Sequence, residues 1–270
     1  MKILFIGDIV GKPGRRAVAQ ALPELRKKND IDLVIANGEN SAHGRGVTKS
    51  TLNELFAAGV DLVTSGNHWF DQPEAKAIVA DTTIPFIRPA NYPAGTIGSG
   101  YRLVTVRTKK VLVINLMGQV FMHQGLDNPF KKLDALLQET AAQKPDAIIV
   151  DFHADATSEA MAFSFYADGR ISAALGTHTH VPTDDAMLLP KGTGHVADVG
   201  MVGPRLSVLG IAPQQIINHF LHDQPFKWEI PETGEIVLNY ALVELDDKRN
   251  DVGVQLCKKI ERHTQIITLK

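Results

Sequence analysis

The stretch Gly176-Thr177-His178-Thr179-His180 places two histidines one residue apart, directly after the apolar residues 171–175. A short apolar run of this kind is typical of a buried strand, so the histidine pair is expected where a strand leaves its sheet. Neutral imidazole is the commonest transition-metal ligand, and two rings at this spacing can face one point. Two of ten histidines can also fall together by chance, so the pair alone indicates a metal site only weakly.

The region upstream of this pair alternates between strand and helix patterns. Buried strands are expected at residues 3–6, 33–36 and 61–64, and helices at residues 15–28 and 49–58 connect them. This alternation predicts a mainly parallel sheet with helices on its faces. Ligands bind such sheets at the carboxyl ends of the strands, which is where the polar residues of this region fall.

The second half of the chain is expected to supply a second sheet, packed on the first, with helices outside both. A hairpin turned at Lys109-Lys110 opens this part. Further strands are expected at residues 147–150, 171–175, 186–189, 194–199, 236–245 and 252–258, and helices at residues 131–142, 158–167 and 214–221. No linker marks a domain boundary, so residues 1–270 are predicted to form one α/β domain.

Composition excludes several classes of protein. The chain carries 28 basic and 30 acidic side chains, so its net charge of −2 does not favour a nucleic-acid surface, although a local basic patch and RNA binding stay open. No run of about 18 apolar residues is present, so no membrane span is expected. The apolar residues 3–6 are too few for a secretory signal, and the single Cys257 excludes an internal disulfide. A cytoplasmic protein fits these features.

Five of the expected strands end in oxygen or imidazole ligands. Each ending has an ordinary explanation by itself: Asp8 could cap the following loop, and an isolated His153 is more often a hydrogen-bonded core residue. Five such endings at one edge of one sheet are not expected by chance, and together they predict a metal site. The residues are Asp8, Glu39, Asn40, Asn67, His68, His153, His178 and His180.

These segments resemble the calcineurin-like metallophosphoesterases. That superfamily carries an early Asp, a bridging acidic residue, a Gly-Asn-His-[Asp/Glu] segment, a lone His and a late Gly-His-x-His. The matching segments here are Gly7-Asp8, Gly38-Glu39-Asn40, Gly66-Asn67-His68, His153 and Gly176-Thr177-His178-Thr179-His180. The chain is more closely similar to the YmdB-type branch of small bacterial phosphodiesterases, with further matching segments at residues 7–11, 37–40, 114–118, 152–159 and 198–201.

The resemblance spans about residues 1–260 and implies a four-layer α/β/β/α sandwich of two mixed sheets flanked by helices. It also implies two divalent metal ions bridged by Glu39. One ion would take Asp8, Glu39, Asn40 and His180, and the other Glu39, Asn67, His153 and His178. Mixed nitrogen and oxygen ligands without cysteine suit iron or manganese, with zinc also possible.

The sequence departs from the superfamily pattern near these ligands. Val10 stands where a histidine usually follows the first aspartate, and the resemblance implies that Asn40 takes its place. Trp69 occupies the position at which many relatives carry an acid after Asn-His, and the nearby Asp71 is not assigned that role.

The implied reaction is hydrolysis of a small phosphodiester, such as a 2′,3′-cyclic nucleotide, by a metal-bridging hydroxide with His68 as general acid. Arg45 and His123 are candidates for contact with the substrate. Two alternatives stay open: a phosphomonoesterase or RNA-cleaving nuclease on the same site, and a regulatory protein that senses a ligand with weak turnover. A homo-oligomer is also possible.

Overall fold

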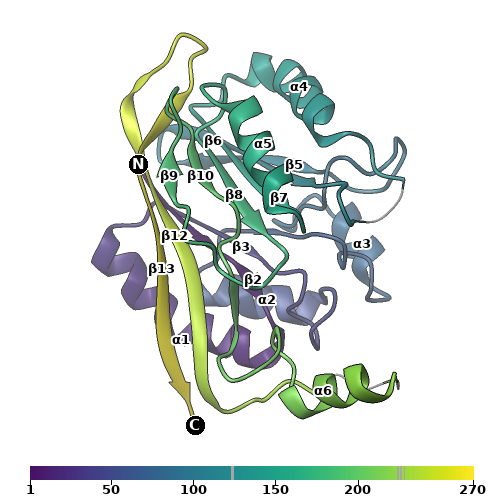
Figure 1. Cartoon of the computed structure of the whole chain (residues 1–270). Helices are drawn as coiled ribbons and strands as arrows, with labels where there is room; N and C mark the ends of the chain where they lie inside the picture. The colour runs from purple at the N-terminus through teal and green to yellow at the C-terminus, as the bar shows by residue number, and fades with distance from the viewer. Residues whose placement is uncertain (123–124, 224, 226, 228) are drawn as a thin grey trace.

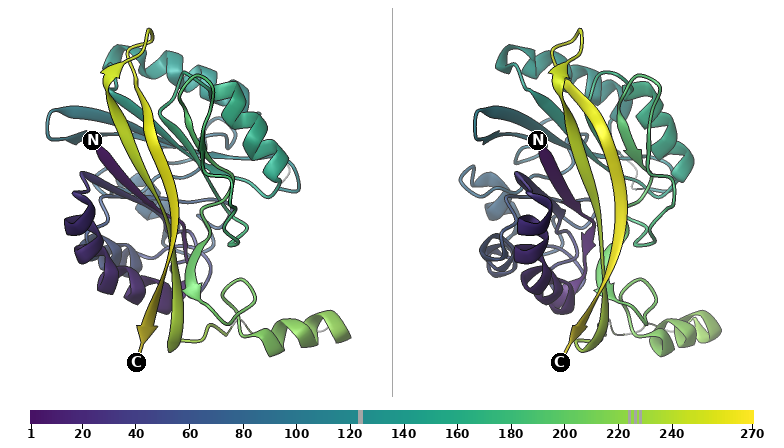
Figure 2. Two further views of the ribbon diagram at one scale, coloured as in Figure 1. Left: turned by 60° about the vertical axis from the view of Figure 1, so that its left-hand side comes forward. Right: turned by 90° about the vertical axis from the view of Figure 1, so that its left-hand side faces the viewer.

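The computed structural model describes residues 1–122, 125–223, 225, 227 and 229–270. Two β-sheets lie face to face, and helices cover the outer face of each sheet (Figures 1 and 2). The expected four-layer α/β/β/α sandwich of two mixed sheets is therefore confirmed. None of the helices among these residues is both long and apolar enough to span a membrane.

The first sheet has the strand order β2-β11-β12-β1-β3-β4, and β13 also pairs with β12. Strands β1, β3 and β4 run parallel to one another, whereas β12 is antiparallel to its neighbours β1, β11 and β13. The bounds of these strands are β1 Lys2–Ile6, β2 Asp8–Ile9, β3 Leu33–Asn37, β4 Leu62–Thr64, β11 Met201–Pro204, β12 Gly234–Arg249 and β13 Gln255–Leu269.

The second sheet has the strand order β5-β6-β7-β8-β10-β9. Its central strands β6, β7, β8 and β10 are parallel, and the edge strands β5 and β9 are antiparallel to their neighbours. The bounds of these strands are β5 Tyr101–Val106, β6 Lys109–Met117, β7 Ala147–His153, β8 Ala173–Thr177, β9 Met187–Leu188 and β10 Gly194–Val196.

Helices α1 and α2 pack on the first sheet, and α4 and α5 pack on the second, while α6 extends away from both sheets (Figure 2). The bounds are α1 Gly11–Asn29, α2 Lys49–Ala58, α3 Ala75–Ala80, α4 Pro129–Thr140, α5 Thr157–Ala167 and α6 Pro213–His222, with a 3₁₀ turn at Ala141–Gln143 after α4. Helix α2 has its expected bounds. The Thr48 hydroxyl accepts a hydrogen bond from the amide of Thr51 at its start, and Gly59 ends it at φ 106°.

Three layers of apolar side chains follow from the alternation of residues along the strands. In β1, Ile3 and Phe5 point between the two sheets, whereas Leu4 and Ile6 point toward α1 and α2. Strand β6 alternates in the same way between the first sheet and the helices α4 and α5. Because both faces of these strands are buried, their sequences are continuously apolar rather than alternating.

The sequence had indicated that the strands of the second half of the chain form the second sheet, but three of them belong to the first sheet. Strands β11, β12 and β13 return to the first sheet, where β12 pairs along the whole of β1. Strand β11 was not expected, because its four residues end in Gly203-Pro204 and carry little strand signal. The sequence of a strand indicates that the strand is buried, but it does not indicate which of the two sheets the strand joins.

Several element boundaries also differ from the expectation. Helix α1 begins at Gly11 and not near residue 15, because Pro13 falls in the first turn, where a missing amide hydrogen costs nothing. The hairpin turns at residues 107–108, since Val106 pairs with Lys109. Strand β13 runs to Leu269, well beyond the expected end at residue 258.

Replacing Phe5 by alanine tests the layer between the sheets. Phe5 is fully buried there, so Phe5→Ala should lower the free energy of unfolding by about 3–5 kcal/mol, measured by urea denaturation. Phe165→Ala is the matched control, because Phe165 is exposed on α5 and its loss should change stability by less than about 0.5 kcal/mol. Equal stability of the two variants would contradict this packing.

Candidate metal centre

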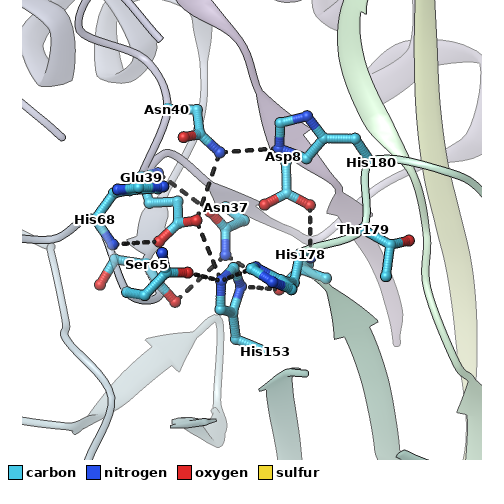
Figure 3. Close-up of polar contacts among 12 residues, drawn as sticks. Asp8, Asn37, Glu39, Asn40, Ser65, His68, His153, His178, Thr179 and His180 are labelled. Atoms are coloured by element: carbon cyan, nitrogen blue, oxygen red, sulfur yellow. Dashed lines mark hydrogen bonds and ion pairs between the residues drawn. The ribbon is translucent and has the colours of Figure 1, made fainter. Parts of the chain in front are cut away.

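The two sheets each contribute half of one polar cluster at the carboxyl ends of their central strands (Figure 3). The expectation that all these residues lie at the edge of a single sheet is wrong. The first sheet supplies Asp8, Glu39, Asn40, Asn67 and His68, which follow β1, β3 and β4. The second sheet supplies His153 at the end of β7, and His178 and His180 after β8.

Three possible ligand atoms surround the Nε2 atom of His153. It lies 3.1 Å from Glu39 Oε1, 2.9 Å from Asn67 Oδ1 and 3.0 Å from His178 Nδ1. Glu39 and His153 are buried, and their ligand atoms with that of His178 form a group of the size that can hold a metal ion. The geometry therefore brings together the four residues that the family resemblance implies for one ion.

The other predicted set lies on the opposite side of Glu39. Asn40 Nδ2 is 3.0 Å from His180 Nε2 and 3.5 Å from Glu39 Oε1. A half-turn of this amide would present Asn40 Oδ1, the atom that binds cations. Asp8 Oδ2 accepts the backbone amide hydrogen of His178, whereas its buried Oδ1 has no hydrogen-bond partner among the described residues. A buried carboxylate oxygen in this state fits a cation ligand.

The charges in the cluster also favour a cation. Burial alone would raise the pKa of Glu39, but the His153 imidazolium beside it lowers that pKa to about 2. Burial lowers the pKa of His153, yet Glu39 and then Asp8 raise it to about 9. Burial holds the pKa of Asp8 well above its usual value, and that of His178 at about 3. The carboxylates thus require a positive charge between them, which a divalent ion supplies as well as a proton does.

Hydrogen bonds behind the cluster orient the imidazole rings. The Thr177 hydroxyl donates to Asp151 Oδ1 at 2.7 Å, so it accepts from His153 Nδ1 at 2.9 Å. His180 Nδ1 donates to the carbonyl oxygen of Leu209 at 3.0 Å. Both arrangements place the ring proton on Nδ1 and turn Nε2 toward the cluster, so a metal ion that replaced any proton on Nε2 would meet the electron pair of that nitrogen.

The histidine pair itself has an unusual backbone. His178 and His180 have φ values of 118° and 65°, which residues other than glycine rarely adopt. Between them, the amide and hydroxyl of Thr179 both donate to Asp198 Oδ2 at 2.8 Å. Asp198 therefore holds the turn from which the His178 ring meets His153 and the His180 ring meets Asn40. His195, in the neighbouring strand β10, contacts Ser164 and Asp185 instead.

Sequence reasoning missed the residues behind the ligands. Asp151 and His153 alternate along β7, and Asp151 is fully buried with Asn37 Nδ2 3.1 Å from its Oδ2. A charged residue two positions before a candidate ligand in a buried strand lies on the same face, so the signal was present. Thr177 carried no such signal, because threonine is common in strands.

His68 belongs to the polar cluster but not to the two implied sets of metal ligands. Its backbone amide donates to Glu39 Oε2 at 3.0 Å, and its ring Nδ1 is 2.7 Å from Asp71 Oδ2. Arg45 is exposed in the loop after the Glu39 turn, where its carbonyl oxygen accepts from Gln72. The other substrate-contact candidate, His123, lies outside the described residues.

A fold of two facing mixed sheets with this carboxylate, amide and imidazole cluster at their carboxyl ends defines the metallophosphoesterase class. The family model described as "YmdB-like protein" matches residues 4–260, and the chain belongs to this family. The family implies divalent metal ions.

Known proteins agree with this membership. The chain is 44% identical, over 92% of each chain, to a protein of Bacillus subtilis (strain 168) named 2′,3′-cyclic-nucleotide 2′-phosphodiesterase. It is similar to the crystal structure of a hypothetical protein from Thermus thermophilus, with 41% identity, a TM-score of 0.88 and coverage of 98% and 99%. It is also similar to that of a novel phosphatase from Mycoplasma pneumoniae, with 34% identity, a TM-score of 0.89 and coverage of 98% and 93%.

Gly66 gives a test of this geometry. A Cβ atom at this position would lie 2.1 Å from His153 Nε2, so Gly66→Ala must displace the imidazole from the cluster. We expect metal affinity to fall by about 10–100-fold, the usual cost of disturbing a ligand's position, measured by elemental analysis after dialysis against a metal buffer. Gly95→Ala is the control: its Cβ meets open space, so the backbone strain at φ 86° can lower its stability but should leave its metal content unchanged. Wild-type metal content in a folded Gly66→Ala protein would refute the placement.

Proposed function

We propose that this protein is a metal-dependent phosphodiesterase that hydrolyses small cyclic nucleotides, with 2′,3′-cyclic nucleotides as the substrate class. The observation that carries the proposal is the cluster of candidate ligands around Glu39, of which Glu39, Asn40, His178 and His180 line a cavity of about 320 Å³. This volume lies at the lower end of the range of small-molecule pockets, about 300–1,000 Å³. The name of the Bacillus subtilis relative supports the same class of substrate.

The proposed ligands form two sets around Glu39. Asp8, Glu39, Asn40 and His180 hold one ion, and Glu39, Asn67, His153 and His178 hold the other. Iron or manganese fits these nitrogen and oxygen donors best, and zinc is an alternative. When bound, two such ions activate a water molecule and neutralise charge on the phosphoryl group.

The carboxylates set the charge of the loaded site. Asp8 and Glu39 bring two negative charges, which balance only half of the charge of two divalent cations. The remaining positive charge attracts a phosphodiester anion and stabilises the additional negative charge of the transition state.

His68 is proposed to protonate the leaving oxygen. Its side chain lines the cavity, and because Asp71 occupies Nδ1, the Nε2 nitrogen is the one that can meet the substrate. The water oxygen forms a bond to phosphorus, the bond from phosphorus to O2′ breaks, and O2′ takes a proton from His68. The Asp71 carboxylate, 2.7 Å from Nδ1, orients the ring, so it acts as a positioning residue.

Replacing His68 tests its role. His68→Ala should retain both metal ions but lose about 10²–10⁴-fold in kcat on 2′,3′-cyclic AMP, the usual contribution of a proton-transfer group. A substrate with a nitrophenyl leaving group needs little protonation, so its turnover should fall far less. Full kcat of metal-loaded His68→Ala on the cyclic nucleotide would exclude the general-acid role.

Glu39→Gln tests the bridge. The amide keeps the shape of the side chain but removes the negative charge that both ligand sets share, so both ions and the activity should be lost together. Elemental analysis of the purified variant measures the metal, and Glu54→Gln on the exposed face of α2 is the control. Two bound ions in Glu39→Gln would contradict the shared ligand.

A substrate panel separates this proposal from its alternatives. Metal-loaded protein should hydrolyse 2′,3′-cyclic nucleotides with a higher kcat/KM than nucleoside monophosphates or single-stranded RNA. A preference for monoesters or RNA would favour a phosphatase or nuclease. Tight nucleotide binding without turnover would favour a ligand-sensing role.

A further inference from the structure

The cavity above the metal centre has a polar floor and an apolar wall. The floor is made of the candidate metal ligands Glu39, Asn40, His178 and His180, together with His68. The wall comes from the segment before α1, the loop before α6, α6 itself and the segment that leads to β12. Its side chains are Val10, Val208, Leu209, Ile211, Ile216, His219, Phe220 and Ile230. Metal ions and the phosphate of a substrate would bind at the floor, and neither would contact the apolar wall.

The part of the wall formed by Val10 and residues 208–211 is held in place by close packing and hydrogen bonds. Gly210, at φ 100°, comes so close to Val10 that a Cβ atom on it would lie 2.7 Å from Val10 Cγ1. The Val208 and Ile211 backbones exchange two hydrogen bonds of 2.8 and 3.0 Å, which close this loop on itself. The Leu209 carbonyl accepts the hydrogen bond of His180 Nδ1. The apolar wall is thus fastened to one of the residues of the floor.

Helix α6 supplies the outer wall. Ile216 is its buried residue, whereas Phe220 lines the cavity and yet leaves 81% of its surface exposed. The helix is fixed at its start, where the Ala212 amide donates to the Glu229 carbonyl oxygen at 2.9 Å and Gln215 Nε2 donates to the Glu229 carboxylate at 2.6 Å. An exposed aromatic ring at the rim of a cavity is a surface on which a flat ligand can stack.

From this arrangement we infer that the apolar wall binds the base of the nucleotide, with Phe220 as its stacking surface. The inference rests on the proposed function, because the floor must hold the phosphate. In a 2′,3′-cyclic nucleotide the base is the part with apolar faces, and it projects from the opposite face of the ribose ring to the cyclic phosphate. Among the described wall residues, His219 carries the only polar side chain. The wall therefore offers few hydrogen bonds to the edges of the base, which are the parts that differ between bases. All four bases should therefore be accepted, with kcat/KM values within about ten-fold of one another.

Removing the base from the substrate and the ring from Phe220 should have the same effect. Phe220→Ala should raise KM for adenosine 2′,3′-cyclic phosphate about ten-fold with little change in kcat, as expected when stacking stabilises the substrate and the transition state equally. The same variant should not change KM for ribose 2′,3′-cyclic phosphate, which has no base. Phe220→Trp should restore the wild-type KM. Phe165→Ala, an exposed phenylalanine on α5, is the control and should leave both substrates unaffected.

A binding measurement separates failure of this inference from failure of the proposed function. Adenosine 3′-phosphate, the product of hydrolysis at O2′, should bind the protein about ten-fold more weakly after Phe220→Ala, measured by calorimetry. If neither cyclic substrate is hydrolysed but this difference in binding persists, the base site stands and the proposed activity fails. An unchanged KM and an unchanged affinity in Phe220→Ala, or equal losses with and without the base, would overturn the base site.

Discussion

The contact between Glu39 and His153 is the interaction on which the rest of the structure depends. It joins a carboxylate from the first sheet to an imidazole from the second, at 3.1 Å and with almost no solvent exposure. Burying such a pair is costly unless every remaining donor and acceptor has a partner. The hydrogen bonds of Asn67, Thr177 and the His68 amide supply these partners. This contact therefore joins the carboxyl end of β3 in the first sheet to that of β7 in the second.

The sequence predicted most of the residues that the structure brings together at the strand ends, but only part of the fold. The polar residues of the site follow short apolar runs, and the end of a buried strand is a feature that a local pattern shows well. The identity of the sheet that each strand joins depends on contacts between distant residues. For that reason the return of β12 to β1 was missed, and the ligands were placed on one sheet although His153 and His178 come from the other.

The parts of the site that escaped prediction are those without a local signal. Thr177 orients His153 through its hydroxyl, but in sequence it is one more strand threonine. The wall of the cavity is harder still, since Val10, Leu209 and Phe220 come from segments that no sequence pattern connects. An apolar residue in a loop is as easily a core residue as a ligand contact, and only the packed structure separates the two.

Val10 links the metal centre to the cavity wall. Position 10 is the place where a histidine is expected in related proteins, and a metal-binding imidazole there would put a polar ring where the wall is now apolar. In this chain Asn40 lies against His180 instead, so the ligand set does not need position 10. The valine packs against Gly203 and Gly210, and its side chain faces the cavity. In the proposed site, the ligand role of Asn40 and the apolar character of the wall both go with valine at position 10, and a histidine there would replace part of the proposed base-binding surface with a polar ring.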